Sequence, residues 1–449
     1  MAGKSGRRGS TRRQALAGIG AAVAAGIAAD GARAQGADNW LQDLFGGKTA
    51  NAAPNPDGAR KAEALNDLRP NATPFRSEEM IQALEDAIQR YQAFAAKGGW
   101  PLIPGTRMIR PEDDDERMPI LRRRLAMGGE LRSRREAQSF SYDGDLETAV
   151  RRFQESNGLR ASGRVDKPTL VALNIPIQAR VVQLQTNLQR LRDLMQQRPE
   201  DRYVLVNVAA FQLEAVERGE VQQRHRTIVG KPERQSPEVK ATIRALNFFP
   251  YWRVPDSVST LDLIPRLQKD ASYLAKEKIR VLSGSFVGPE LDAAAIDWNT
   301  ALAAQIKFRQ DPGPQNALGL MRIDMPNSEG VYMHDTPMKP LFAQRGRAFS
   351  AGCVRVQDVF KLGEWIARYE MGWDKPGRAE DVIAGGNPLD LTLTRPVPVY
   401  FTYITAWAEP DGSVQFRPDL YGRDGHRDLV AGRERDENDG PAPPQTLAP

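Results

Sequence analysis

The sequence contains a single cysteine, Cys353, and His334 precedes it by 19 residues. A cysteine acts as a nucleophile when an imidazole within hydrogen-bond reach takes or shares its proton. A nearby positive charge lowers the pKa of the thiol and favours the thiolate, and Arg355 is placed to supply that charge. These residue types suit nucleophilic catalysis by the cysteine.

The segment before the cysteine suits the same chemistry. Gly352 lets the backbone approach a reacting group closely, so the N–H groups of Gly352 and Cys353 are candidates to face a developing oxyanion. Ser350 is a candidate to order this loop. Asp335 follows His334 directly, and neighbouring side chains in a strand point to opposite faces. We therefore expect a backbone carbonyl, rather than the Asp335 carboxylate, to orient His334.

Residue types alone leave a structural alternative open. A lone cysteine is usually a buried small hydrophobic residue, and a lone histidine is usually structural. One cysteine excludes an internal disulfide framework and any zinc site built from several cysteines. Three histidines leave little for a polyhistidine metal site. These counts give little support for a metal site.

The net charge of +5 is concentrated at the amino-terminal end of the 449-residue chain. Residues 1–34 contain six basic side chains and one acidic side chain, and the rest of the sequence has equal numbers of each. The overall charge therefore gives no support for a nucleic-acid partner. The longest apolar stretch, residues 15–29, is shorter than the roughly 20 residues that cross a bilayer, so no transmembrane span is expected in the mature chain.

Residues 1–34 have the pattern of an export signal. Arg12 and Arg13 precede the weakly hydrophobic stretch at 15–29, and Ala32-Arg33-Ala34 is a small-x-small cleavage site. Paired arginines before a weak apolar core resemble a twin-arginine signal and predict a periplasmic protein. The alternative is an exposed basic tail before a short core helix.

After a linker at 35–75, residues 76–200 are predicted to be mainly helical. Within a helical scaffold at 76–116, Ser77 is predicted to cap a helix that Gly98-Gly99 ends. Three short amphipathic helices are predicted in a module at 117–175. A long helix is expected in the connection at 176–200, with a leucine-rich face toward another domain and Arg and Gln on its other faces.

From residue 201 to about 430 the pattern changes to alternating, strand-like runs. This region is predicted to be a β-rich catalytic domain, interrupted at 257–311 by a helical insertion that caps the site. The charged, Pro-rich tail at 433–449 is predicted to be disordered. The fold class expected for the whole chain is multidomain α+β.

Two motifs resemble a known family of cell-wall enzymes. The segments Tyr332-Met333-His334-Asp335-Thr336-Pro337 and Ser350-Ala351-Gly352-Cys353-Val354-Arg355 are similar to the active-site signature of YkuD-type L,D-transpeptidases. Most of that family has Gly after the histidine, whereas a large subgroup with a capping insertion shares the Asp found here. The sequence Pro250-Tyr251-Trp252-Arg253-Val254-Pro255 is also similar to that subgroup. The helical module at 117–175 resembles a peptidoglycan-binding domain.

The resemblance implies a role for each motif residue. Cys353 would be the nucleophile and His334 the general base and acid. The oxyanion and substrate residues would be Gly352, Tyr332, Arg355, Ser350 and Trp252. The family cleaves the bond between a diamino acid and a terminal D-alanine in a tetrapeptide stem of peptidoglycan. An amine of a second stem then resolves the thioester and forms a 3→3 crosslink, without a cofactor. A carbapenem presents the same acyl chemistry and is an expected inhibitor.

Three alternatives remain open. Water in place of the acceptor amine would make the protein an L,D-carboxypeptidase, and a protein amine would make it a lipoprotein-attaching transpeptidase. The third alternative is a non-catalytic wall-binding scaffold with a structural Cys353. Reactivity of the thiol in the folded protein separates the scaffold from the enzymes.

Overall fold

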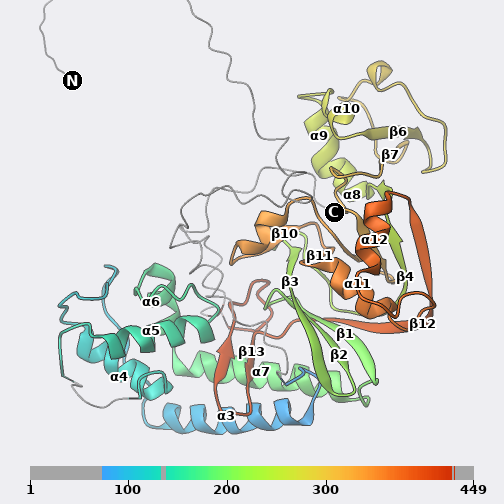
Figure 1. Ribbon diagram of the computed structural model, residues 1–449. Helices are drawn as coiled ribbons and strands as arrows, with labels where there is room; N and C mark the ends of the chain where they lie inside the picture. Colours follow the sequence, from blue (N-terminus) through green and yellow to red (C-terminus); the bar gives the residue numbers. More distant parts are fainter. Residues whose placement is uncertain (1–72, 133–137, 427–428, 430–449) are drawn as a thin grey trace, which may run out of the picture. The chain divides into compact units, whose positions relative to one another are not determined.

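The structure is a computed structural model that describes residues 73–132, 138–426 and 429 (Figure 1). The predicted export signal, residues 35–72 of the predicted linker and the predicted disordered tail lie outside the described residues. Within the described part of the chain, no helix is long and apolar enough to cross a membrane.

The first described helix, α3 (Glu78–Ala96), begins where the sequence predicts. The Ser77 hydroxyl accepts a hydrogen bond from the Met80 N–H, which otherwise has no partner in the first turn. The helix buries Leu84, Ile88 and Tyr91 along one face. The cap and the apolar face therefore fix both the start and the orientation of α3.

The predicted three-helix module is confirmed. It consists of α4 (Met118–Gly128), α5 (Gly144–Ser156) and α6 (Lys167–Leu173). Asp143 caps α5 and Asp166 caps α6. The three helices share one core, which includes Leu121, Leu125, Leu146, Phe153, Leu170 and Leu173.

The long helix α7 (Ile177–Met195) lies beside α3 (Figure 1). The expectation that Arg and Gln occupy its exposed faces is wrong for Arg180 and Gln183, which are buried together with Asn187. These three side chains hydrogen-bond to buried polar groups elsewhere in the fold, so burial leaves them with partners.

The β-rich region is built on a nine-stranded sheet in the order β10-β3-β11-β9-β8-β4-β12-β1-β2. Its strands are β1 (Arg202–Asn207), β2 (Gln212–Glu217), β3 (Glu220–Gly230), β4 (Val239–Phe248), β8 (Met321–Asp324), β9 (Met333–His334), β10 (Ala348–Ser350), β11 (Val354–Val356) and β12 (Leu389–Thr402). Because β2 also pairs with β3, every strand of this sheet except β10 belongs to a closed ring.

Apolar side chains from the strands of this sheet and from the helices next to it form one core. The core includes Ile243, Leu246, Ile323, Met333, Val354, Val356 and Val399. The apolar helix α11 (Val359–Ala367) adds Leu362 and Ile366, and α12 (Arg378–Gly385) adds Ala379. Met333 and Val354 therefore anchor β9 and β11, the strands next to the candidate site, in the core.

The predicted insertion is not helical throughout. It contains α8 (Asp256–Val258), a π-helical turn (Ser259–Leu263), α9 (Ile264–Leu267), α10 (Tyr273–Lys276) and a 3-10 turn (Ala293–Ala295). It also has its own sheet, β5-β7-β6, made of β5 (Trp252–Arg253), β7 (Ile306–Gln310) and β6 (Ile279–Ser283). The alternation of buried and partly exposed residues in β7 is the period-two signal of a strand. The insertion thus has a core of its own and starts earlier than residue 257.

The remaining elements are a 3-10 helix (Lys339–Ala343) and a hairpin of β13 (Ala406–Ala408) and β14 (Val414–Phe416). The hairpin packs on α3 through aromatic rings. Phe75 meets Trp407 with ring centroids 5.2 Å apart, and Tyr91 meets Phe416 at 5.8 Å. The segment that follows β12 is therefore held against the first described helix.

Candidate active site

Two adjacent parallel strands bring the candidate residues together. In the register of β9 and β11, Met333 lies opposite Val354 and His334 lies opposite Arg355. The Val354 N–H donates to the Tyr332 carbonyl at 3.0 Å, so Cys353 lies next to Tyr332. Because side chains alternate along a strand, His334 and Arg355 point to the face opposite the core residues Met333 and Val354.

The Cys353 thiol is buried, with 6% of the residue exposed. Burial raises the pKa of the thiol to about 11. Hydrogen bonds from the Tyr332 peptide N–H and hydroxyl act in the opposite direction, as does the charge of Arg355. Burial prevails, and the resting group at neutral pH is a neutral thiol.

His334 is fully buried, and a backbone carbonyl orients its ring, as the sequence predicts. Its Nδ1 contacts the main-chain oxygen of Asp335. Its Nε2 makes no well-formed hydrogen bond within the described part of the chain, although the Leu318 backbone lies near the ring and favours the protonated form. Burial, followed by the charge of Arg355, lowers the pKa of His334 to about 3. The imidazole is therefore neutral, and Nδ1–H donating to the carbonyl leaves Nε2 as a proton acceptor.

The Asp335 side chain points away from the imidazole and holds the backbone beneath it. One carboxylate oxygen accepts from the Leu320 N–H at 3.0 Å, and the other contacts Lys339. A Cβ at Gly319 would lie 2.4 Å from the first of these oxygens, so only glycine leaves room for the buried carboxylate. Asp335 therefore fixes the chain at 319–320.

Arg355 places a cation on the same side of the sheet. Its side chain is 2% exposed, and burial lowers its pKa to about 10. It remains charged at neutral pH, which opposes protonation of His334 and favours negative charge on Cys353.

The loop at 350–353 differs in one respect from the expectation. The Ser350 hydroxyl donates to the Cys353 carbonyl at 2.6 Å and accepts from the Gly352 N–H at 3.2 Å. Ser350 therefore orders the loop. Because the Gly352 N–H is engaged there, it is not directed at an oxyanion, contrary to the sequence prediction. The Cys353 N–H has no hydrogen-bond partner in the described part of the chain.

Trp252 is not an exposed groove residue. It is 1% exposed and belongs to the core of the insertion, which Tyr332 and Ala351 of the catalytic region also contact. The Trp252 side chain approaches the Tyr332 hydroxyl closely enough to lower the pKa of the phenol, although burial raises that pKa overall. Through this pair, the insertion reaches the hydroxyl that lies beside Cys353.

Arg322 was missed by the sequence analysis. It lies opposite His334 in the register of β8 and β9, and its guanidinium is 5.6 Å from the centre of the Tyr332 ring. Its charge lowers the pKa of both Cys353 and Tyr332. No motif marks this arginine, and only its register on the neighbouring strand reveals it.

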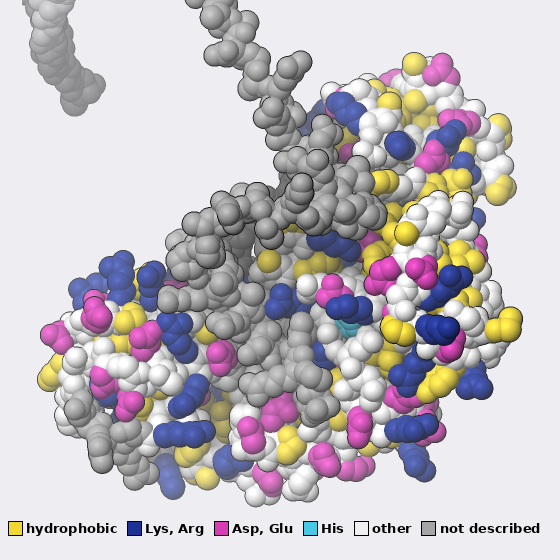
Figure 2. All heavy atoms as spheres, in the orientation of Figure 1, with side chains coloured by type: hydrophobic (Ala, Val, Ile, Leu, Met, Phe, Trp, Pro, Cys, Tyr) yellow, Lys and Arg dark blue, Asp and Glu magenta, His cyan; other side chains and the backbone are white. Residues whose placement is uncertain are grey.

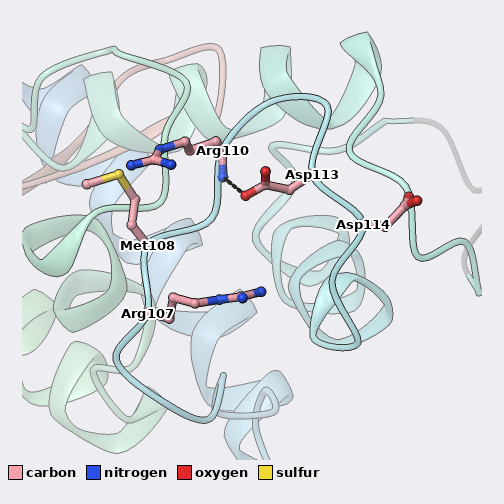
Figure 3. A pocket seen from close by; sticks show the side chains of 5 residues that line it. All are labelled: Arg107, Met108, Arg110, Asp113 and Asp114. Carbon is pink, nitrogen blue, oxygen red and sulfur yellow. Dashed lines mark hydrogen bonds between the residues drawn. The ribbon is translucent and has the colours of Figure 1, made fainter.

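Other surface features are less specific. Basic and acidic side chains are interspersed over the face seen in Figure 2. Among the described residues, no group of three or more His, Cys, Asp or Glu is placed to hold a metal ion. A cavity of about 310 Å³ lies before α4 and is lined by Arg107, Met108, Arg110, Asp113 and Asp114 (Figure 3). This cavity belongs to the segment leading into the three-helix module and contains none of the motif residues.

Comparison with known families decides the assignment. Residues 201–397 match the YkuD family, described as the L,D-transpeptidase catalytic domain. This region is a YkuD-type L,D-transpeptidase domain. Residues 129–173 match a family described as "Putative peptidoglycan binding domain". Both resemblances drawn from the sequence are thereby confirmed.

A curated protein of Haemophilus influenzae, named "Putative L,D-transpeptidase", is 31% identical to the chain over 222 residues. The aligned stretch covers 49% of this chain and 44% of that protein. The chain therefore spans less than half the length of this L,D-transpeptidase relative.

Solved structures of L,D-transpeptidases are also similar to the chain. One, from Stackebrandtia nassauensis, is 13% identical with a TM-score of 0.25, over 65% of this chain and 96% of that one. Another, from Mycobacterium smegmatis, is 13% identical with a TM-score of 0.23, over 45% of this chain and 58% of that one. At these low scores the superpositions carry no weight, and the assignment rests on the family match.

Proposed function

We propose that this protein is a peptidoglycan L,D-transpeptidase that forms 3→3 crosslinks through a thioester on Cys353. The observation that carries the proposal is the arrangement within the YkuD-type domain. A buried thiol lies beside Tyr332, and two positions further along the same register His334 lies opposite Arg355. The substrate would be a tetrapeptide stem, cleaved between its diamino acid and its terminal D-alanine.

The pKa directions define how the proton moves in the first step. Thiol and imidazole are both neutral at rest, so the thiol proton passes to Nε2 of His334 as the sulfur attacks the carbonyl carbon. The Cys353 N–H and the Tyr332 hydroxyl stabilise the oxyanion. The carbon–nitrogen bond then breaks, His334 returns the proton to the departing D-alanine amine, and the acyl group remains on sulfur.

The second step reverses these roles. The side-chain amine of a second stem attacks the thioester and gives its proton to His334. The carbon–sulfur bond breaks, and the thiolate recovers that proton. The product is an amide between two diamino acids, and the enzyme returns to its neutral thiol and imidazole. No group outside the protein and its two substrates is needed for this balance.

The position of the insertion is relevant to whether an amine or water attacks the thioester. Its core packs against Tyr332 and Ala351, which flank the buried thiol. We propose that it acts as a cap that opens to admit the stem and then excludes water from the thioester. A cap that fails to exclude water would give an L,D-carboxypeptidase, and one that admits a protein amine would give a lipoprotein-attaching enzyme.

The rest of the chain suits a wall-associated enzyme. The three-helix module would hold the enzyme on peptidoglycan, and the leader at 1–34 would direct export to the periplasm. The non-catalytic scaffold is disfavoured, because the YkuD-type region carries the cysteine, the histidine and the arginine of the motif, the last two opposite each other on adjacent strands.

Mass spectrometry of purified disaccharide-tetrapeptides after incubation with the enzyme tests the proposal. A crosslinked dimer that has lost one alanine supports transpeptidation. A monomeric tripeptide with free alanine indicates the carboxypeptidase, and an unchanged substrate with an unreactive Cys353 indicates the scaffold.

A further inference from the structure

A buried serine outside the signature motifs contacts the loop that carries the cysteine. Ser236 follows β3 and is fully buried. Its hydroxyl donates to the Gly352 carbonyl at 2.7 Å and accepts from the Gly230 N–H at 3.0 Å. The Ser236 hydroxyl is therefore both a hydrogen-bond donor and an acceptor, and these two contacts fix its position.

The Gly352 carbonyl belongs to the same peptide group as the Cys353 N–H. In a planar trans peptide the C=O and N–H point in opposite directions, so holding the oxygen also sets the direction of the hydrogen. Gly352 has a φ of +125°, a conformation in which glycine tolerates more than one orientation of the following peptide. An external contact is then what selects one of them.

We propose that Ser236 is a positioning residue that directs the Cys353 N–H into the oxyanion site; this rests on the proposed function, because only acyl transfer at Cys353 develops an oxyanion there. Ser236 touches neither substrate nor sulfur in this role. It acts through the Gly352–Cys353 peptide.

Tyr421 holds Ser236 in turn. Its hydroxyl donates to the Gly230 carbonyl at 2.7 Å and accepts from the Ser236 N–H at 3.2 Å. A Cβ on Gly230 would stand 2.1 Å from the Arg234 carbonyl oxygen and 2.6 Å from the Ser236 nitrogen. The turn at 231–236 therefore folds back onto Gly230 at a distance that only glycine permits, and Tyr421 closes it.

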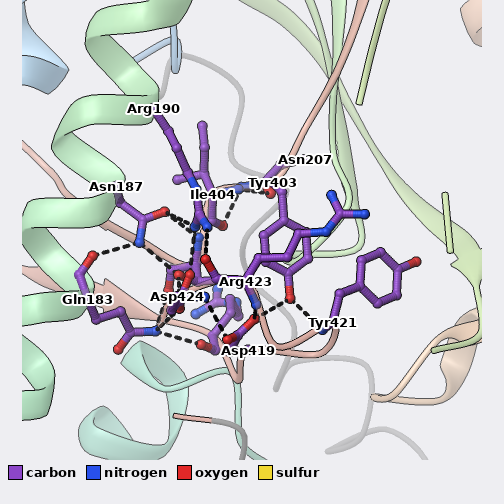
Figure 4. A network of polar contacts seen from close by, with 12 residues as sticks. Gln183, Asn187, Arg190, Asn207, Tyr403, Ile404, Asp419, Tyr421, Arg423 and Asp424 are labelled. Carbon is purple, nitrogen blue, oxygen red and sulfur yellow. Dashed lines mark hydrogen bonds and ion pairs between the residues drawn. The ribbon is translucent and has the colours of Figure 1, made fainter. Parts of the chain in front are cut away.

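Tyr421 belongs to a hydrogen-bonded network that begins at α7 (Figure 4). Its N–H donates to the Tyr403 hydroxyl at 2.7 Å, and Tyr403 donates to Asp419 at 2.8 Å. The Asp424 N–H donates to Asp419 at 2.8 Å, and Asp424 accepts from Arg190 of α7 at 2.7 Å. The segment 419–424 thus links α7 to the peptide beside Cys353 through Tyr421 and Ser236.

Two reactions of the same thiol separate positioning from general structural support. A carbapenem acylates sulfur: the thiol adds to the lactam carbonyl, the ring carbon–nitrogen bond breaks, and nitrogen takes the thiol proton. Iodoacetamide alkylates sulfur: iodide leaves a saturated carbon, the thiol proton goes to the buffer, and no oxyanion forms. A misdirected Cys353 N–H slows only the first reaction.

The experiment compares both rates in the full-length protein and in Ser236→Ala and Tyr421→Phe. Acylation by a carbapenem is expected to fall about 10- to 100-fold in Ser236→Ala, the scale of a misplaced catalytic group, and less in Tyr421→Phe. Alkylation and its pH dependence are expected to stay unchanged. The control is Thr227→Val, which removes another fully buried hydroxyl, one without a partner among the described residues. Both rates should be unaffected by it.

Equal losses in acylation and alkylation, or no loss in either variant, would overturn the positioning role. Should Ser236→Ala fail to fold, the selective loss in Tyr421→Phe decides the question alone. A wild-type protein that is alkylated at Cys353 but never acylated contradicts the proposed function itself, and the role of Ser236 falls with it. The two failures therefore give different patterns.

Discussion

His334 faces Arg355 across the adjacent parallel strands β9 and β11. Burial, together with a neighbour that is charged at neutral pH, disfavours a positive charge on the ring and lowers the pKa of His334 to about 3. The register therefore produces a neutral imidazole that can accept a proton from the equally neutral Cys353. A preformed thiolate–imidazolium pair is not the resting state of this geometry.

The pH dependence of alkylation follows from this resting state. Because burial raises the pKa of Cys353 to about 11, only a small fraction of the folded protein is thiolate at pH 9, and half of it is thiolate only near pH 11. The rate of alkylation by iodoacetamide should rise about tenfold per pH unit through pH 9 and begin to level off only near pH 11. Rates measured by intact mass between pH 6 and 11 check this, with the unfolded protein in denaturant as control. A plateau already reached at pH 8 would demonstrate a stabilised thiolate.

Replacing Arg355 should shift the acid limb of the pH profile of acylation to higher pH. Arg355→Met keeps an apolar side chain of similar length but removes the charge that helps to lower the pKa of His334. The imidazole should then protonate at higher pH, so acylation by a carbapenem should be lost earlier as the pH falls. Arg253→Met, at an exposed arginine of the insertion, is the control and should leave the profile in place. Identical profiles for Arg355→Met and wild type would contradict the electrostatic role.

Removing the imidazole of His334 should lower the rate of acylation by the factor that a general base contributes. His334→Ala is expected to slow acylation about 10²–10⁴-fold, the contribution of a positioned general base to a proton transfer. Single-turnover acylation by a carbapenem at pH 7 measures the loss. His225→Ala is the comparison, since His225 is also buried but hydrogen-bonds to Gln357 and Gln223 away from the motif. A His334→Ala protein that acylates at the wild-type rate would assign the base elsewhere.

The buried polar side chains of α7 should contribute to the stability of the fold and not to catalysis. Asn187 accepts from the Thr405 N–H at 2.8 Å and donates to the Thr405 hydroxyl at 2.7 Å. Asn187→Ala leaves that N–H buried and unpaired, which should lower the free energy of unfolding by about 1–3 kcal/mol. Denaturant unfolding measures it, and Gln189→Ala, on the exposed side of the same helix, is the matched control. Equal stability of the two variants would show that the buried contact contributes little.

The sequence predicts the parts of this fold that depend on local signals. The cap at Ser77, the apolar spacing of α3 and the apolar run of β1 are all read within a few residues. The strands of the insertion were missed because β6 and β7 are short and separated by a long irregular stretch. The pairing of β7 with both β5 and β6 is a long-range contact that no local pattern reveals.

The candidate site also contains some residues that local sequence patterns predict and others that they do not. Cys353, His334 and Ser350 stand in recognisable motifs, whereas Arg322 and Ser236 reach the site only through the register of the sheet and a turn. The Gly352 N–H was assigned to the oxyanion site because its type and position allow that role. The nearer Ser350 hydroxyl takes that hydrogen bond instead, a competition that only three-dimensional structure shows.

The most direct test of the proposed function is an acid quench of the enzyme with a disaccharide-tetrapeptide, followed by intact-mass and peptide mass spectrometry. Because Cys353 is the only cysteine, a thioester has one possible location. The account predicts an adduct on Cys353 that equals the substrate less one alanine, and its conversion to a crosslinked dimer when acceptor is added. An adduct on another residue, or a dimer that still forms with Cys353→Ala, would contradict it.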